Sequence, residues 1–593
     1  MPLRIEDYAL IGDGHTAALV GNDGSIDWLC LPRFDSAACF AALLGTEAHG
    51  RWRIAPASPV RAVRRRYRPG TLVLETEFDT AEGTVALVDC MPLRNGAADL
   101  VRVVEGRRGR VPMAMELVLR FDYGSLVPWV HRTSDGTLLA VCGPDQVALR
   151  TPAPIHGEDC RTLGEFTVGA GETVPFHLVW TPSHLKPGAP VDAQEAIAAT
   201  EHHWRDWLAG ARVAEETLAP EMLRRSLLTL KALTYAPTGG ICAAPTTSLP
   251  ETLGGERNWD YRLCWLRDAA LTLNALVGAG HLAEAESWRR WLVRAVAGTA
   301  SQVQPLYGLS GERRVPEMEL SWLPGYEGAK PVRIGNDAGT QRQLDVYGEV
   351  IDAFHAAEHS GLKPDKQAAA VTRGMLQHLA EVWREPDEGI WEVRGPRRQF
   401  VHSKVMVWVA FDRAVKAAEH GTLDGPVEAW RAQRDAVHAE ICARGFDARR
   451  GCFVQSYGAT AMDASLLRMA LVGFLPADDP RFQGTVRAIE EDLLEDGLVL
   501  RYRPDAAVEG LAPTREGTFL ACTAWLGEVY ALQGRRAEAE AVLQRLLGIA
   551  NDVGLLAEEY DHIARRQVGN FPQAFSHLGL VGLCMALARQ PAR

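Results

Sequence analysis

The residues best suited to chemistry lie in one short stretch, residues 253–270, which reads LGGERNWDYRLCWLRDAA. It places the charged residues Arg257, Asp260, Arg262, Arg267 and Asp268 among the aromatic residues Trp259, Tyr261 and Trp265. A solvated surface does not need three aromatic rings, and a dry core does not easily hold five charges. Polar groups interleaved with flat rings suit a sugar, which carries hydroxyls on its edges and C–H groups on its faces. A loop held by structural Arg–Asp pairs would have the same composition, so this stretch alone does not distinguish a sugar-binding site from a structural loop.

Two segments further along the chain carry acid–base candidates. Residues 387–395 (DEGIWEVRG) hold Glu392 between apolar neighbours, and residues 555–561 (LLAEEYD) hold Glu558 among other acids. Cleavage of an acetal needs a proton for the departing oxygen and a partner that activates water or attacks the sugar carbon. An apolar wall would keep Glu392 protonated, whereas Tyr560 and backbone carbonyls could hold a water near an ionised Glu558. Either glutamate alone is better interpreted as one of 75 acidic residues that are merely solvated.

Size and composition describe an ordinary globular protein. A chain of 593 residues is too long for one core, so two or three domains are expected. The net charge of −12 argues against nucleic acid or an anionic membrane as partner. Eleven scattered cysteines without a C-x-x-C pair fit a reducing compartment and argue against a zinc site. No EF-hand or H-E-x-x-H spacing is present in the sequence, so we expect no metal or redox cofactor.

The ends of the chain carry no targeting signal that we recognise. Residues 1–10 mix charged and apolar side chains, unlike a signal peptide. The apolar stretch at 578–588 is about half the ~20 residues that a membrane span needs. We therefore expect a cytoplasmic protein with no membrane partner. The sequence is compatible with a homo-oligomer but does not specify the oligomeric state.

Residues 1–190 are expected to form an antiparallel β-sandwich. Segments such as 71–79, 83–89 and 114–122 alternate apolar and polar residues, and turn signals separate them. Many short strands without intervening helices predict packed antiparallel sheets. The GDGHTA sequence at 12–17 matches a dinucleotide-binding loop, but it leads into a strand-like segment and not into a helix, so we reject that interpretation.

The pattern changes to helical spacing after a Pro/Gly-rich segment at 187–190. We expect a linker helix within 191–218, followed by a domain over 219–593. Twelve helices are predicted there, near 219–236, 267–280, 281–298, 344–360, 366–385, 402–420, 425–444, 462–473, 480–495, 516–533, 535–550 and 572–589. Helices in sequence-adjacent pairs predict an (α/α)6 barrel, a ring of six helical hairpins.

Alternate loops of such a ring emerge on the same face. The loops expected there are 253–267, 305–337, 385–399, 445–459, 499–516 and 551–571. Long ordered loops in a compact domain are usually functional, so we expect a pocket at that mouth of the ring. From the N-terminal domain, Asp27, Trp28 and Arg33 could also reach the pocket, although a hairpin packed on the barrel would explain them equally well.

Taken together, these motifs resemble glycoside hydrolase family 15, which contains glucoamylases, glucodextranases and trehalases. The resemblance covers nearly the whole chain. It rests on IEDYALIGD at 5–13, GSIDWLCLPRFDS at 24–36, GGERNWDYRLCWLRDA at 254–269, GIWEVRG at 389–395, EGTFLACTAWL at 516–526 and GNFPQAFSHL at 569–578. The resemblance implies an N-terminal β-sandwich, a catalytic (α/α)6 barrel and hydrolysis of an α-glucosidic bond with inversion, which releases β-glucose.

The resemblance also implies roles for individual residues. Glu392 matches the family's general acid, and Glu558 matches its general base, with Glu559 as the alternative. An inverting pair should be about 6.5–9.5 Å apart, which leaves room for a water molecule. Arg501 should reach the first sugar, although the neighbouring Arg503 leaves the register open. The full set of residues expected to contact the sugar is Trp259, Tyr261, Trp265, Arg267, Asp268, Trp391, Arg501 and Glu559.

The substrate is less well specified than the family. A cytosolic enzyme has little access to external starch, and the opening segment most resembles the trehalase branch, so we expect trehalose. Exo-hydrolysis of maltooligosaccharides or isomaltooligosaccharides is the close alternative. A disaccharide phosphorylase would use phosphate in place of Glu558. A non-catalytic sugar-binding protein would keep Trp259 and Trp265 but would need neither glutamate.

Overall fold

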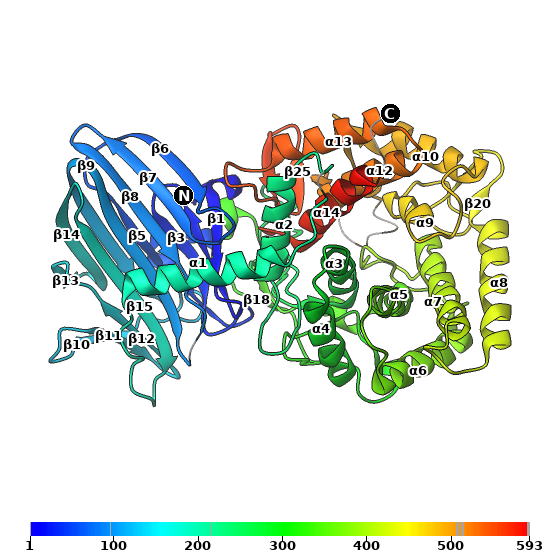
Figure 1. Cartoon of the computed structure of the whole chain (residues 1–593), viewed down its shortest axis with the longest axis horizontal. Helices are drawn as coiled ribbons and strands as arrows, with labels where there is room; N and C mark the ends of the chain where they lie inside the picture. Colours follow the sequence, from blue (N-terminus) through cyan, green and yellow to red (C-terminus); the bar gives the residue numbers. More distant parts are fainter. Residues whose placement is uncertain are drawn as a thin grey trace.

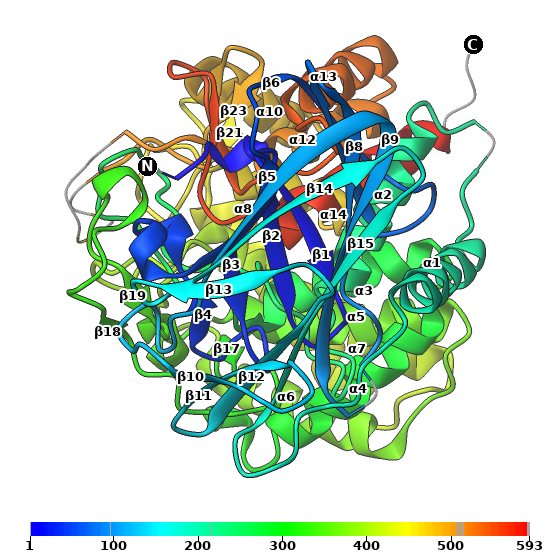
Figure 2. The ribbon, with the colours of Figure 1, turned by 90° about the vertical axis from the view of Figure 1, so that its left-hand side faces the viewer.

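The computed structural model describes residues 2–94, 96–214, 216–505, 508, 510 and 515–589. Strands form one part of the molecule and a ring of helices forms the other (Figure 1). Figure 2 looks onto the strands, with the helices behind them. The predicted order, a β-sandwich followed by a helical barrel, is confirmed.

The β part is antiparallel throughout. The strands are β1 (Tyr8–Gly12), β2 (Ala17–Gly21), β3 (Ser25–Cys30), β4 (Ala38–Phe40), β5 (Arg51–Pro56), β6 (Val60–Tyr67), β7 (Leu74–Thr80), β8 (Gly83–Cys90), β9 (Ala98–Val118), β10 (Trp129–Arg132), β11 (Leu138–Cys142), β12 (Asp145–Arg150), β13 (Ile155–Glu158), β14 (Arg161–Gly169) and β15 (Thr173–Pro182). Their main order in space is β1-β2-β3-β5-β9-β15-β12-β11-β10.

The long strand β9 joins the two layers of the sandwich. Its first half pairs with β8 and β15, and its second half pairs with β5 and β14. Gly109 lies between the halves with φ +71°, and a Cβ there would lie 2.0 Å from the Glu82 carbonyl oxygen. Only glycine fits this bend, because it accepts positive φ and leaves room for the neighbouring backbone. Trp52 and Phe176 pack edge to face inside, with ring centroids 6.4 Å apart.

Helix α1 (Ala193–Ala209) connects the two parts. The side chain of Asp192 caps it by accepting hydrogen bonds from the amides of Gln194 and Glu195, which satisfies two of the free N–H groups of the first turn. The helix packs against β9 and β15 at one end and reaches α2 at the other (Figure 1). The division expected at 190 falls between β15 and α1, and the one expected at 218 falls between α1 and α2.

Two concentric layers of helices form the barrel (Figure 1). The inner helices are α3 (Leu266–Gly278), α5 (Asp345–His359), α7 (Val401–Glu419), α9 (Arg468–Leu471), α12 (Leu520–Leu532) and α14 (Ala574–Ala588). The outer helices are α2 (Pro220–Ala232), α4 (Leu282–Ala295), α6 (Lys366–Val382), α8 (Val427–Arg444), α10 (Pro480–Leu493) and α13 (Arg536–Ile549). Each inner helix contacts the next, and α14 returns to α3, which closes the ring.

Burial separates the two layers. The inner helix α12 is buried on nearly all sides, whereas the outer helix α8 buries only Trp430, Val437 and Ile441. All twelve predicted helical segments contain a helix within a few residues of the expected place. The segment 462–473 differs most, because a 3-10 turn (Ala464–Leu467) precedes a single α-turn. Asp463 explains this start, since its carboxylate accepts from the Ser465 amide and hydroxyl.

Strands and barrel meet at the loops that precede α3. The Trp28 indole N–H donates to the Pro245 carbonyl at 2.8 Å, and Arg262 donates to the Ser36 carbonyl at 2.9 Å. Arg33 forms an ion pair with Glu312 at 3.0 Å. The N-terminal domain therefore supports the loops at the mouth of the ring. No helix in the described part of the chain has both the length and the apolar character needed to cross a membrane.

Candidate active site

Two adjoining cavities lie where the long loops meet the inner helices. The inner cavity has an empty volume of about 390 Å³, and the outer cavity has about 520 Å³. They share Tyr261, Trp391, Glu392 and Arg501 in their walls. The inner cavity is completed mainly by the first turns of α3 and α14, whereas loop residues complete the outer one. Part of the predicted loop 499–516 lies outside the described residues.

Glu392 lies in the wall common to both cavities. Its Oε1 accepts a hydrogen bond from the Trp265 indole at 2.6 Å, and an Arg267 nitrogen lies 3.5 Å away. The Glu392 backbone has φ +57°, a left-handed conformation that is uncommon and strained for a residue with a side chain. Burial raises the pKa of the Glu392 carboxyl, and the positive charge of Arg267 opposes that rise. This environment favours a carboxyl group that can donate a proton.

Glu558 lies directly behind Tyr261. Its Oε1 accepts a hydrogen bond from the Tyr261 hydroxyl at 2.6 Å, and its side chain is fully buried. Gly569 packs against it so closely that a Cβ would lie 2.6 Å from Oε2, and only glycine leaves that space at φ +78°. Burial, reinforced by the negative charge of Glu251, raises the pKa of Glu558 to about 8. The Tyr261 hydrogen bond and the Arg501 charge pull it back down.

The ionisation of Glu558 differs from what the sequence predicted. The segment LLAEEYD predicted an ionised Glu558 in contrast to a protonated Glu392. In the structure burial raises the pKa of both carboxyl groups, so Glu558 is not ionised more easily than an ordinary glutamate. The reason is that Glu558 is enclosed by protein on all sides, which disfavours the charged form more than its polar neighbours favour it.

An aromatic pair connects the two carboxyl groups. Tyr261 and Trp265 touch edge to face, with ring centroids 5.3 Å apart and an angle of 68° between the rings. Tyr261 donates to Glu558, and Trp265 donates to Glu392, both at 2.6 Å. The spacing of four residues along the chain therefore places the two donors side by side. Glu392 and Glu558 belong to one site, at opposite ends of this pair.

Arg267 and Asp268 form the polar floor of the inner cavity. The guanidinium of Arg267 lies 2.9 Å from an Asp268 oxygen and also donates to the Ile390 carbonyl at 2.5 Å. Both side chains are buried in the first turn of α3, where the helix dipole favours the Asp268 carboxylate. The Phe575 ring lies beside them, with the guanidinium carbon of Arg267 5.7 Å from its centroid. Charged edges and an apolar face suit a single hexose.

Arg501 is the arginine that reaches the cavities. It lines both of them and makes a two-pronged contact with Glu516 at 2.6 and 2.7 Å. Arg503, the alternative register, is exposed and forms an ion pair with Glu495. Trp259 lines the outer cavity with the Arg394 guanidinium carbon 4.2 Å from its ring centroid.

Apart from Glu558 and Glu559, every predicted site residue lines at least one cavity. Glu559 is buried on the far side of the outer-cavity wall. The sequence did not single out Glu251, Asn336 or Gln341, which also line the outer cavity. Their loops carry no local motif, and only the folded ring brings them to the site. Asp27, Trp28 and Arg33 line neither cavity.

Comparison with known proteins identifies the family. Residues 218–584 match the model of glycosyl hydrolases family 15, and residues 1–156 match the trehalase-like N-terminal domain. The chain belongs to glycosyl hydrolase family 15. This family 15 chain is 38% identical to a trehalase of Mycobacterium tuberculosis, over 99% of this chain and 91% of that protein. It is 33% identical to a trehalase of Thermoplasma volcanium, over 98% and 92%.

Solved structures show the same fold for this family 15 chain. A bacterial glucoamylase complexed with acarbose matches with a TM-score of 0.70 and 11% identity, over 99% of this chain and 94% of that one. A variant glycosidase in complex with glucose matches with a TM-score of 0.51 and 20% identity, over 68% and 100%. The family and the fold predicted from the motifs are confirmed.

Removing the Tyr261 hydroxyl should change the pH dependence of the reaction. In Tyr261→Phe, Glu558 loses the donor that favours its ionised form, so the pKa of Glu558 should rise. The acidic limb of the kcat/KM profile should then move to higher pH by about one to two units, since a hydrogen bond to a charged group contributes ~1.5–3 kcal/mol and one pKa unit is ~1.4 kcal/mol. Initial rates across pH measure this. A limb that stays in place would mean that Glu558 does not limit the rate.

Proposed function

We propose that this family 15 hydrolase is an inverting trehalase, with Glu392 as general acid and Glu558 as general base. One observation carries the proposal: Trp265 donates a hydrogen bond to Glu392, Tyr261 donates one to the buried Glu558, and the two rings touch in the wall of the inner cavity, so both carboxyl groups are held by the same aromatic pair. Trehalase relatives that cover nearly the whole chain support trehalose as the substrate.

The two cavities suit the two rings of a disaccharide. One glucose occupies the inner cavity, where Arg267 and Asp268 bind its outer hydroxyls. The second glucose occupies the outer cavity beside Trp259. The glycosidic bond then lies at the junction of the cavities, within reach of Glu392. Because Glu392 lies in the wall that both cavities share, its carboxyl group can reach the bond between the two rings.

Hydrolysis then needs one proton donated and one removed. Glu392 donates its proton to the bridging oxygen as the C–O bond to the inner glucose breaks. A water beside the Tyr261 hydroxyl attacks the anomeric carbon from the opposite face and loses a proton to Glu558. The inner ring leaves as β-glucose, and the outer ring leaves as α-glucose. Proton exchange with solvent restores Glu392 protonated and Glu558 ionised for the next turnover.

Substrate preference separates this proposal from its alternatives. Purified protein should release glucose from trehalose with a kcat/KM well above the values for maltose and isomaltose. A clear preference for maltose would favour glucoamylase-type action. Phosphate-dependent release of glucose 1-phosphate would indicate a phosphorylase, and sugar binding without turnover a binding protein. All eleven cysteines are free thiols, which supports a reducing, cytoplasmic location as part of this proposal.

A further inference from the structure

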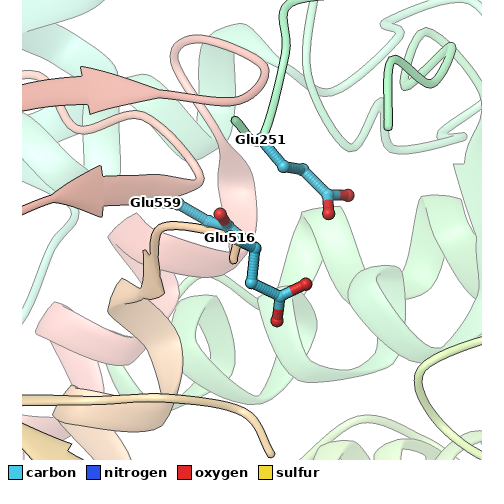
Figure 3. A group of neighbouring side chains, drawn as sticks. All are labelled: Glu251, Glu516 and Glu559. Atoms are coloured by element: carbon cyan, nitrogen blue, oxygen red, sulfur yellow. The ribbon is translucent and has the colours of Figure 1, made fainter. Parts of the chain in front are cut away.

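Three glutamates are buried together at the wall of the outer cavity, which Glu251 lines and Glu516 and Glu559 do not. Glu251, Glu516 and Glu559 come from three separate segments of the chain, and Figure 3 shows their side chains as neighbours. One carboxylate oxygen of each lies within 4.8 Å of the others, and all three residues are at most 5% exposed. Three carboxylates cannot share so small a buried volume as three negative charges unless positive charge or protons compensate them.

Two arginines compensate two of the glutamates. Arg501 lies 2.6 Å from Glu516 and 2.8 Å from Glu251. Arg257 lies 3.3 Å from Glu516 and 3.9 Å from Glu251. By contrast, both carboxylate oxygens of Glu559 are buried and have no hydrogen-bond partner among the described residues. A buried carboxylate without a partner is among the most costly groups in a protein, so burial of Glu559 favours its neutral, protonated form.

We propose that Glu559 is a positioning residue that stays protonated during turnover and donates its O–H to the carboxylate of Glu251 or Glu516. This proposal rests on the proposed role of its neighbour Glu558. A carboxyl oxygen of Glu559 lies within 4.8 Å of an oxygen of each of Glu251 and Glu516, so a small movement of the side chains would bring one of them within hydrogen-bond distance. Burial, together with the negative charges of Glu251 and Glu516, raises the pKa of Glu559 well above its usual range, in agreement with that state.

A proton fits this cluster better than a metal ion. Three carboxylates could in principle bind a divalent cation. The guanidinium groups of Arg501 and Arg257 already contact two of the three carboxylates. A cation between the glutamates would lie close to both positive charges, which would repel it. A proton completes the cluster without that repulsion.

The cluster matters for catalysis because Glu558 and Glu559 are consecutive. Glu559 begins strand β25 (Glu559–Asp561), which pairs with β24 (Thr518–Phe519), and β24 begins two residues after Glu516. Side chains alternate between the two sides of an extended chain, so Glu558 points to Tyr261 while Glu559 points towards Glu251 and Glu516. A neutral Glu559 fixes the backbone of Glu558 and adds no negative charge that would oppose its ionisation.

Two substitutions of Glu559 test this state. Glu559→Leu removes the O–H donor and should lower kcat/KM about tenfold or more, because a buried carboxylate loses its partner. Its acidic limb should move to higher pH, since the less compensated carboxylate of Glu251 then opposes ionisation of Glu558. Glu559→Gln keeps the shape of the side chain and supplies an N–H donor. Its kcat/KM should therefore stay within about threefold of the wild-type value, and the acidic limb of its pH profile should not move.

The opposite shift would overturn the proposal. If Glu559 were ionised, both substitutions would remove a negative charge beside Glu558 and move the acidic limb to lower pH. A folded but inactive Glu559→Gln would also contradict it.

A second measurement applies if Glu559→Leu fails to fold. The infrared C=O stretch of a protonated carboxyl group should be present in the wild type and lost in Glu559→Gln, and its absence from the wild type would show that Glu559 is ionised. One tightly bound divalent cation per chain that Glu559→Gln removes would show a metal site instead. Full activity of Glu558→Gln, measured in parallel, would disprove the proposed function separately.

Discussion

Replacing Glu392 by glutamine should lower kcat for trehalose by about 10²–10⁴-fold, the usual contribution of a general acid. Glutamine keeps the shape of the side chain and can still contact the Trp265 indole, but it has no proton to give to the departing oxygen. Initial rates of glucose release measure the loss. The melting temperature should stay close to that of the wild type, because the substitution leaves no cavity.

The leaving group gives a sharper test of the role of Glu392. Fluoride leaves without protonation, so Glu392→Gln should hydrolyse α-glucosyl fluoride far better, relative to wild type, than it hydrolyses trehalose. Glu385→Gln is a matched control, because Glu385 is exposed near the same loop and contacts Arg342 outside both cavities. Equal losses for the fluoride and for trehalose would argue against Glu392 as the acid.

Replacing Glu558 by glutamine should lower kcat for both trehalose and α-glucosyl fluoride by about 10²–10⁴-fold, because no group remains to take the proton of the attacking water. Glu559→Gln is the adjacent control and should remain active. Near-normal hydrolysis of α-glucosyl fluoride by Glu558→Gln would remove Glu558 from the base role.

Although Glu558→Gln loses activity, it should gain thermal stability relative to the wild type as the pH rises. The pKa of Glu558 is about 8 in the folded protein, against an ordinary value of 4.5, so folding favours the protonated form. Its contribution to stability is fully present below about pH 4.5 and is lost as the pH rises towards about 8. Glutamine does not titrate, so the melting temperature of Glu558→Gln relative to wild type should increase between about pH 5 and pH 8. A constant difference would contradict a raised pKa.

Much of the fold follows from local patterns in the sequence. Alternation predicted the sandwich, and helical spacing predicted all twelve barrel segments, because each helix must bury one or more faces in the ring. The short α9 was not predicted as such, since its start depends on hydrogen bonds from Asp463 that do not appear in the apolar pattern. The bend at Gly109 was missed for a similar reason, because the close contact comes from a neighbouring strand.

The site was predictable where its residues share one motif. Tyr261, Trp265 and Arg267 lie within seven consecutive residues, and the segment that leads into the first turn of α3 places all three in the wall of one cavity. Glu251 was missed because its meeting with Arg501 spans 250 positions in the chain. The raised pKa of Glu558 was also missed, because its acidic neighbours in sequence say nothing about burial. Burial is a property of the whole ring.

The anomeric form of the first glucose released tests most directly whether Glu392 and Glu558 act across one bond. Proton NMR of trehalose hydrolysis, recorded before mutarotation, should show α- and β-glucose in equal amounts, because one ring is inverted and the other keeps its configuration. With water labelled by oxygen-18, only the β-glucose should carry the label. Release of α-glucose alone would show retention and would contradict a water activated by Glu558.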